Sequence, residues 1–282
     1  MNLRFPDFLG IGAQKAGTTW LHLNLRRHPG VWLPPVKELQ YFNEIYVRRH
    51  RRWMVPYRKK HGIRALYHHI DKVPREKWNY RLIGRLADII EAEISDEWYG
   101  SIFALAQKRQ ICGEVSPQYS LLPDQGIEHI LRLSPEVKII FSLRDPIERN
   151  WSQIRMISTG KSEEPRTDLM RIAELPDVVQ RANYPAIIAR WSKFVPEDRM
   201  LILFMEDILE KPLELMAQVC KFLGVDFKKE MFPRLNKPAY VGKPLEMPPE
   251  VYGLLKDQLH PVYLEMSKLY PENAGKWLQR HY

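Results

Sequence analysis

The chain has 282 residues, of which 45% are hydrophobic and 27% are charged, and its net charge is +9. It is too apolar for a disordered chain, it has too few glycines for a collagen, and no internal repeat recurs. Its two cysteines, Cys112 and Cys220, are too few for a disulfide scaffold and lack the spacing of metal ligands. We therefore expect one globular domain, residues 1–282, with two buried thiols in a reducing compartment.

The N-terminal segment lacks a charged region followed by an apolar core, so it does not resemble a signal peptide. No stretch reaches the roughly 18–20 apolar residues that a membrane-spanning helix needs. Both observations favour a soluble, cytoplasmic protein without a membrane partner.

Short apolar runs alternate with helical patterns, which predicts βαβ units and an α/β fold with a central, mostly parallel sheet. The run Lys138–Leu143 is apolar on both faces, as expected for a strand that helices cover on each side. The predicted strands are Phe8–Gly12, Gln110–Glu114, Lys138–Leu143 and Met200–Phe204. The predicted helices are Thr18–Arg27, Arg85–Glu93, Asp124–Leu133, Ile147–Ser158, Tyr184–Phe194, Pro212–Leu223 and Pro249–Leu269.

The first predicted strand ends in a loop with Gly12 and Gly17 five residues apart, after which Thr18-Thr19 open a helix. Glycines at this spacing let main-chain N–H groups approach an anion, and the helix N-terminus adds partial positive charge. A P-loop nucleoside triphosphatase has lysine directly after the second glycine, whereas here Lys15 precedes it. The loop therefore predicts a phosphate site of another kind; an ordinary glycine turn is the alternative.

The segment from residue 45 to residue 70 contains eight lysines and arginines and no acidic residue. Such a basic lobe attracts an anionic substrate, a nucleic acid or a lipid surface, or is simply solvated. Trp53 and Tyr57 within it suit base stacking and equally suit packing against the core.

A second anion site is predicted after the strand Lys138–Leu143. Arg144 follows the carboxyl end of this strand, where open α/β sheets bind ligands. Its guanidinium group is a bidentate fork for phosphate, and Ser152 adds a hydroxyl from the second turn of the next helix. An Arg144-Asp145 pair that merely caps this helix is the alternative.

With these motifs in order, the chain resembles the sulfotransferases that use 3′-phosphoadenosine-5′-phosphosulfate (PAPS) and release 3′-phosphoadenosine-5′-phosphate (PAP). The resemblance implies a three-layer, P-loop-like fold. It implies that the loop with Lys15 and Thr19 binds the 5′-phosphosulfate and that Arg144 and Ser152 bind the 3′-phosphate. A further match is the segment Phe204-Met205-Glu206-Asp207, followed by Phe222-Leu223-Gly224-Val225. The residues assigned to the nucleotide are Lys15, Ala16, Gly17, Thr18, Thr19, Trp20, Arg144, Ser152 and Lys243.

The segment beginning Lys37-Glu38 resembles the heparan-sulfate and bacterial carbohydrate branch of that family, in which the glutamate is the acceptor base. Glu114, at the end of a predicted strand, is the competing base. Gln40 and Val115 stand where this branch commonly has histidine and lysine, which weakens the case for a polysaccharide acceptor. We expect a small-molecule or carbohydrate acceptor with a hydroxyl or amine group.

The resemblance implies in-line transfer of the sulfuryl group, with Lys15 at the bridging oxygen and Glu38 or Glu114 as catalytic base. No metal is required. The basic loop Phe232–Pro249, with five prolines, contains Lys243, a candidate 3′-phosphate contact.

Two alternatives stay open at this point. A P-loop kinase would use ATP, with Thr19 and an aspartate, Asp145 or Asp207, holding Mg²⁺. A nucleic-acid-binding protein would use the basic lobe, although we expect no nucleic-acid partner. The oligomeric state is not predicted.

Overall fold

Five parallel strands form one sheet in the computed structural model of the chain, which describes residues 3–158, 166–236 and 245–282. The strand order is β2-β3-β1-β4-β5. The strands are β1 (Phe8–Gly12), β2 (Val31–Trp32), β3 (Ile111–Val115), β4 (Lys138–Leu143) and β5 (Met200–Phe204). Parallel pairing is recorded for every neighbouring pair, so the carboxyl ends of β1, β3 and β4 meet at one edge of the sheet.

Strand positions follow from hydrophobicity. The predicted bounds of β1, β4 and β5 are confirmed, and β3 is shifted by one residue at each end. The strand β2 was not predicted, because its two residues are too few to form an alternating pattern.

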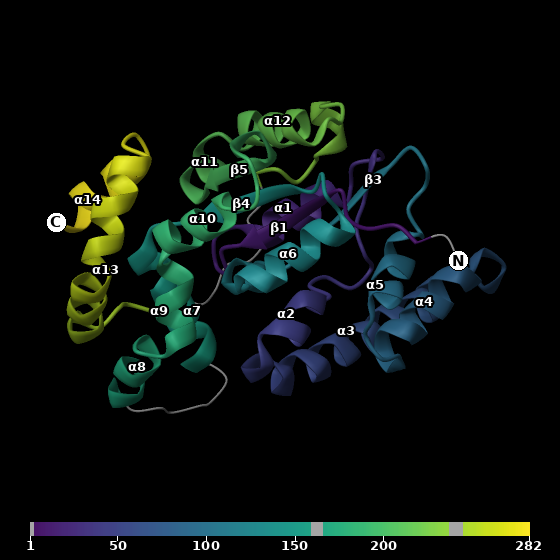
Figure 1. Cartoon of the computed structure of the whole chain (residues 1–282), viewed down its shortest axis with the longest axis horizontal. Coiled ribbons are helices and arrows are strands. Elements are labelled where there is room, and N and C mark those ends of the chain that lie inside the picture. Colours follow the sequence, from purple (N-terminus) through teal and green to yellow (C-terminus); the bar gives the residue numbers. More distant parts are fainter. Residues whose placement is uncertain (1–2, 159–165, 237–244) are drawn as a thin grey trace.

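Each central strand contributes to two cores because its successive side chains point to opposite faces. In β4, Ile139 and Phe141 belong to one buried cluster and Ile140 to the other. Residues of α1 (Thr18–Leu25), α11 (Met205–Glu210) and α12 (Pro212–Leu223) complete the second cluster. The fold is therefore the predicted three-layer α/β arrangement, and Figure 1 shows α11 and α12 together on one side of the sheet.

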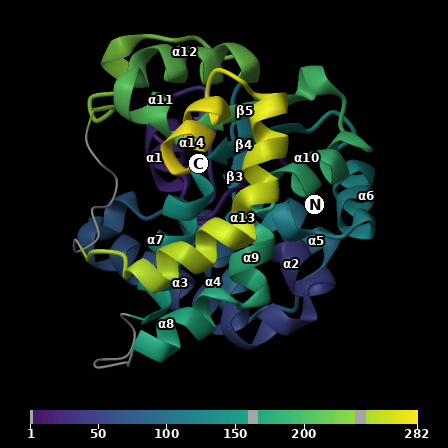
Figure 2. The same cartoon turned by 90° about the vertical axis from the view of Figure 1, so that its left-hand side faces the viewer.

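The first cluster is covered by helices from distant parts of the chain. These are α2 (Tyr41–Tyr46), α4 (Tyr80–Glu91), α5 (Asp96–Phe103), α6 (Asp124–Leu133), α7 (Pro146–Ser158), α8 (Arg166–Ala173), α9 (Pro176–Ala182), α10 (Tyr184–Ser192), α13 (Pro249–Leu269) and α14 (Ala274–His281). Seen from the C-terminal side, α13 and α14 lie in front of the sheet (Figure 2).

The basic segment is part of a long helix, α3 (Arg51–Lys72), which packs against α4. Several of its cations are paired with acids from other parts of the chain: Arg58 with Glu44, Lys59 with Glu91, and Arg49, just before the helix, with Asp177. These pairs explain part of the local excess of positive charge as internal structure.

Among the described residues, no helix is long and apolar enough to cross a membrane. The predicted long loop Phe232–Pro249 is described only at its two ends, and Lys243 lies outside the described residues.

Candidate active site

The loops that follow β1 and β4 lie against each other, because these strands are neighbours in the sheet. The N–H of Ala13 donates to the carbonyl oxygen of Ser142 at 2.6 Å, and the hydroxyl of Ser142 donates to the carbonyl oxygen of Ala16. Ser142 of β4 thus holds the glycine loop from both sides, in a shape set before any ligand binds.

The glycine loop turns sharply into α1. Gly17 has φ +83° and Lys15 has φ +73°, both in the left-handed region. The positive φ strains any other residue at Gly17, and a Cβ there would also overlap the terminal methyl group of Ile208, which would have to move. The first helical hydrogen bond runs from the N–H of Leu21 to the oxygen of Gly17, and no side chain caps the helix. The N–H groups of Thr18 and Thr19 therefore precede the first helical bond, the arrangement that binds anions.

Two residues that the sequence predicted to bind the nucleotide form hydrogen bonds within the protein. The N–H of Ala16 donates to the oxygen of Ala13 at 3.2 Å. The indole of Trp20 is buried and donates to the oxygen of Leu235 at 2.8 Å. The nucleotide-binding role of both residues stays a prediction.

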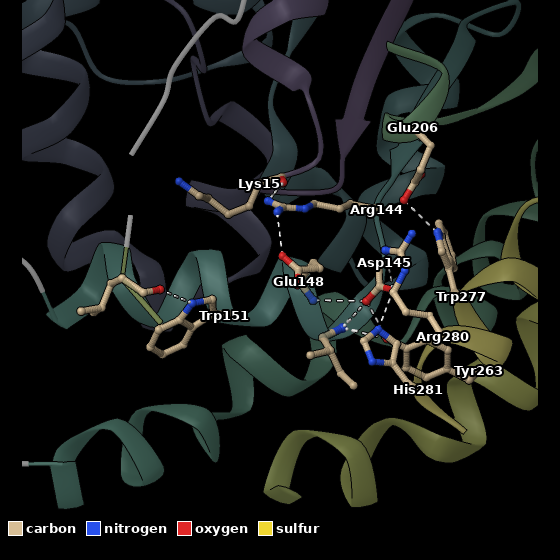
Figure 3. A network of polar contacts seen from close by, with 12 residues as sticks. Lys15, Arg144, Asp145, Glu148, Trp151, Glu206, Tyr263, Trp277, Arg280 and His281 are labelled. Carbon is tan, nitrogen blue, oxygen red and sulfur yellow. Dashed lines mark hydrogen bonds and ion pairs between the residues drawn. The ribbon is translucent and has the colours of Figure 1, made fainter. Parts of the chain in front are cut away.

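The loops of Lys15 and Arg144 meet. A guanidinium nitrogen of Arg144 donates to the main-chain oxygen of Lys15 at 3.4 Å, and Figure 3 shows the Arg144 side chain reaching the main chain of Lys15. Burial lowers the pKa of Lys15, and three neighbouring guanidinium groups lower it further, those of Arg144, Arg155 and Arg149. Such a concentration of cations fits a ligand with more than one negative charge.

Ser152 lies on the face of α7 that carries this positive charge. Residues 148, 152 and 155 are spaced as neighbours along one helix face. Glu148 forms an ion pair with Arg144 at 3.2 Å, and the charge of Arg155 acts on Lys15. Ser152 is buried and lies between them on this face of the helix.

Asp145 is the cap of α7. Its Oδ1 accepts hydrogen bonds from the N–H groups of Ile147 and Glu148 and from the hydroxyl of Tyr263, at 2.6–3.2 Å. Its Oδ2 accepts one from His281 at 2.9 Å. The kinase alternative would use Asp145 or Asp207 for Mg²⁺, and the chain's own donors occupy both oxygens of Asp145.

Glu38 lies close to the start of α1, through Lys37. The ammonium group of Lys37 is 3.1 Å from the hydroxyl of Thr19 and 3.0 Å from Oε1 of Glu38. Glu38 and Gln40 both have positive φ, +61° and +63°, and Gln40 donates to Oε2 of Glu38 at 3.2 Å. Strained conformations of this kind persist where the surrounding structure holds them in place and cluster at functional sites.

Glu114, the competing base, is buried beneath this loop, with 2% of its surface exposed. It accepts hydrogen bonds from the hydroxyl groups of Tyr99, Tyr119 and Ser116 at 2.6–2.7 Å. It also accepts the N–H of Leu39 at 3.2 Å. Burial raises its pKa, which these donors partly offset. The geometry thus makes Glu114 a support of the Glu38 segment.

Two rings of the helix α3 are near enough to Glu38 to be affected by its charge. The rings of Tyr57 and His61 pack one turn apart, with centroids 4.1 Å from each other. Burial raises the pKa of Tyr57, and the negative charge of Glu38 adds to this. Burial lowers the pKa of His61, which the charge of Glu38 opposes. Part of the basic segment is therefore close to the site.

Two buried arginines support the glycine loop and were not predicted. Arg149 donates to the oxygen of Gln14 at 3.0 Å, and Arg181 donates to the Gln14 side chain. Asp177 in turn pairs with Arg181 and His50. The position of Arg149 five residues after Arg144 was the only signal in the sequence. Arg181 is brought in by α9, which no local pattern connects to the loop.

An open pocket of about 460 Å³ lies between α6, α9 and α10. None of the residues predicted for the site lines it. Gln180 of α9 borders this pocket, and the next residue, Arg181, contacts the glycine loop.

A parallel sheet with a glycine loop after its central strand defines the fold as P-loop-like α/β. The comparison with known families is more specific. The model of the sulfotransferase family matches residues 6–229, and the chain belongs to this family.

Among curated proteins, the chain is similar to mouse heparan sulfate glucosamine 3-O-sulfotransferase 5, with 24% identity over 46% of this chain and 40% of that protein. It is also similar to rat carbohydrate sulfotransferase 15, with 23% identity over 96% of this chain and 54% of that protein. Membrane-associated sulfotransferase kil1 of Dictyostelium discoideum is 27% identical over 54% of this chain and 23% of that protein. The chain thus spans about half or less of the length of these relatives.

Solved structures confirm the fold. A sulfotransferase from Alicyclobacillus acidocaldarius superposes with a TM-score of 0.64 at 19% identity, covering 96% of this chain and 98% of that chain. The sulfotransferase domain of the curacin biosynthetic pathway has a TM-score of 0.56 at 20% identity, covering 88% of this chain and 82% of that one.

Proposed function

We propose that the chain transfers the sulfuryl group of PAPS to a hydroxyl or amine of a small-molecule or carbohydrate acceptor. The observation that carries this proposal is the contact between the Lys15 loop and Arg144. Because the two loops meet at adjoining strand ends, this contact supports one site for a nucleotide with a 5′-phosphosulfate and a 3′-phosphate. Family membership supports the same donor.

In this proposal the 5′-phosphate lies at the N-terminus of α1, where it accepts the N–H groups of Gly17, Thr18, Thr19 and Trp20. The 3′-phosphate accepts hydrogen bonds from Arg144 and Ser152. Lys243 is proposed as a further cationic contact of the 3′-phosphate.

Transfer requires the acceptor oxygen or nitrogen to attack sulfur in line with the leaving oxygen. A new bond forms from the acceptor to sulfur while the bond from sulfur to the bridging oxygen breaks, and PAP leaves. Lys15 neutralises the charge that develops on the bridging oxygen. Glu38 takes the acceptor proton. Lys37, between Thr19 and Glu38, links the donor loop to the base.

The acceptor is proposed to lie along α3. Tyr57 and His61 present a pair of rings close to Glu38, and such rings stack against the apolar face of a sugar or another ring. The names of the curated relatives, which include carbohydrate and heparan sulfate sulfotransferases, favour a carbohydrate.

Thermal unfolding with nucleotides tests the donor. PAP at about 100 Kd should add ~2.7 kcal/mol of stability if it binds only the folded chain. ATP with Mg²⁺ should add less, and a chelator should leave sulfuryl transfer unchanged. Stabilisation by ATP with Mg²⁺ that equals or exceeds that by PAP, together with turnover that a chelator abolishes, would favour the kinase instead.

A further inference from the structure

The C-terminal helices α13 and α14 are tied to the loop that carries Arg144. They lie beyond residue 229, where the match to the family model ends. Figure 3 shows Tyr263 of α13 and His281 of α14 both reaching Asp145, the residue that follows Arg144. This part of the chain has no role in the mechanism proposed above.

The hydrogen bonds around Asp145 are specific. Tyr263 donates its hydroxyl hydrogen to Oδ1 of Asp145 at 2.6 Å and accepts the N–H of Ile147 at 3.1 Å. His281 lies 2.9 Å from Oδ2 through Nε2, and its Nδ1 is 3.2 Å from the hydroxyl of Tyr252. With Nε2 as the donor to Asp145, Nδ1 accepts from Tyr252, so both ring nitrogens have a partner.

The helix α14 makes a second attachment at the neighbouring strand. The indole of Trp277 donates to Glu206 at 2.8 Å, in the first turn of α11 directly after β5. His281 is attached to the start of α7, after β4. One short helix therefore holds the beginnings of two elements at the ligand-binding edge of the sheet.

Asp145 and its partners determine the direction of Arg144. The main chain of Arg144 is fixed on one side by the hydroxyl of Tyr184, which donates to its carbonyl oxygen at 2.8 Å. On the other side it is fixed by Asp145, which is 1% exposed. Removing a donor to this buried carboxylate leaves it under-solvated and allows the cap of α7 to shift. Arg144 and Ser152 would shift with the cap.

We propose that Tyr263 and His281 are positioning residues for the 3′-phosphate half of the nucleotide site. They act through Asp145 and touch no substrate. This inference rests on the proposed function, because it takes Arg144 and Ser152 as the ligands of the 3′-phosphate.

The test compares two nucleotides that differ in one group. PAP has the 3′-phosphate and 5′-AMP lacks it, so the ratio of their Kd values reports this half of the site alone. In Tyr263→Phe and His281→Ala, the Kd for PAP should rise about tenfold, the equivalent of one hydrogen bond to a charged group. The Kd for 5′-AMP should change less than twofold.

Tyr270→Phe is the matched control. It removes a hydroxyl from the residue that ends α13, whose ring packs against Phe204 and has no contact with Asp145. It should leave both Kd values unchanged. Thermal unfolding of each variant shows whether the protein is folded under the conditions of the titration.

The inference is overturned if the ratio of the Kd values for PAP and 5′-AMP is unchanged in Tyr263→Phe and His281→Ala. If both Kd values rise equally, the helices only stabilise the fold. If the unmodified protein binds PAP no more tightly than 5′-AMP, the proposed 3′-phosphate site itself is wrong, and the inference fails with it.

Discussion

The residue with the most direct chemical role in the proposed function is Lys15. It stands in a left-handed conformation within a group of cations, and its main-chain oxygen accepts a hydrogen bond from Arg144. A single charged donor at a developing negative charge contributes ~3–4 kcal/mol, or roughly 10²–10³ in rate.

Lys15→Ala should therefore lower kcat by about 10²–10³ while the melting temperature stays close to that of the unmodified protein. Steady-state kinetics with PAPS and thermal unfolding measure the two quantities. Lys108→Ala, which removes an exposed lysine after α5, is the control and should behave as the unmodified protein. Near-normal turnover of Lys15→Ala would remove the proposed role.

The two candidate bases are separated by their surroundings. Glu38 is bordered by Lys37 and Gln40 near the loop, whereas Glu114 is enclosed by four donors. Glu38→Gln should lower kcat by roughly 10²–10⁴ with little change in stability. Glu114→Gln should lower the melting temperature, because an amide nitrogen would face hydroxyl and N–H donors. Steady-state kinetics and thermal unfolding of both variants measure these effects. An unaffected kcat in Glu38→Gln would exclude Glu38 as the base.

Asp177 forms ion pairs with His50 and Arg181, and Arg181 in turn contacts the glycine loop. Burial alone would raise its pKa, but the hydrogen bond from His50 and the charges of Arg181 and His50 outweigh burial and hold the pKa well below its ordinary value. The stabilisation is therefore fully present above the unfolded-state pKa of about 3.9, and it is lost as the pH falls through the folded-state pKa.

Asp177→Asn should reduce the free energy of unfolding at pH 7, and the difference from the unmodified protein should shrink as the pH falls below about 4. Urea unfolding at a series of pH values measures this. Asp198→Asn, at an exposed site, should show no such dependence. A difference that stays constant to pH 3 would contradict the assignment.

At the scale of elements, the junction between the glycine loop and α1 is the most demanding piece of the fold. Gly17 needs a left-handed conformation and space next to Ile208 of α11 at the same time. The loop therefore depends on α11, which comes much later in the chain, directly after the last strand, β5. The parallel sheet also sets α7 beside the loop, so that Arg144 and Ser152 face it.

Gly17→Ala should destabilise the chain by about 1–3 kcal/mol and weaken PAP binding, because alanine is strained at this φ and overlaps Ile208. Ile208→Ala is itself destabilising because Ile208 is buried, so the double variant Gly17→Ala with Ile208→Ala is compared with Ile208→Ala alone. The difference between these two should show only the part of the loss due to the main chain. Chemical unfolding and PAP titration measure both, and a double variant as stable as Ile208→Ala would show that the conformation of Gly17 carries no cost.

At the scale of the molecule, the two ends of the chain serve the same edge of the sheet. The N-terminal half supplies the glycine loop and the Glu38 segment, and the C-terminal helices hold the loop of Arg144 (Figure 3). The family model matches residues 6–229 and ends before α13, whereas the fold shared with the Alicyclobacillus sulfotransferase covers 96% of the chain. The single domain, the cytoplasmic location and the absence of a nucleic-acid partner stay predictions.

Local patterns determined much of the fold. Apolar runs of five or six residues located β1, β4 and β5, and proline at the first position helped to locate α12 and α13. The glycine loop and Arg144 were proposed for a related reason, because each is a short segment whose residue types and spacing suit the binding of an anion. Glu38 was proposed only because its segment resembles the heparan-sulfate and bacterial carbohydrate branch of the family.

The tertiary structure decided what no segment contains. The order of strands, and therefore the meeting of Lys15 with Arg144, depends on pairings between residues more than a hundred positions apart. The burial of Glu114 depends on hydroxyl groups that α5 and the turn after β3 bring to it. The attachment of His281 to Asp145 depends on the last helix reaching back to the sheet. A local pattern records propensity and hydrophobicity, and these contacts exist only once distant segments have packed.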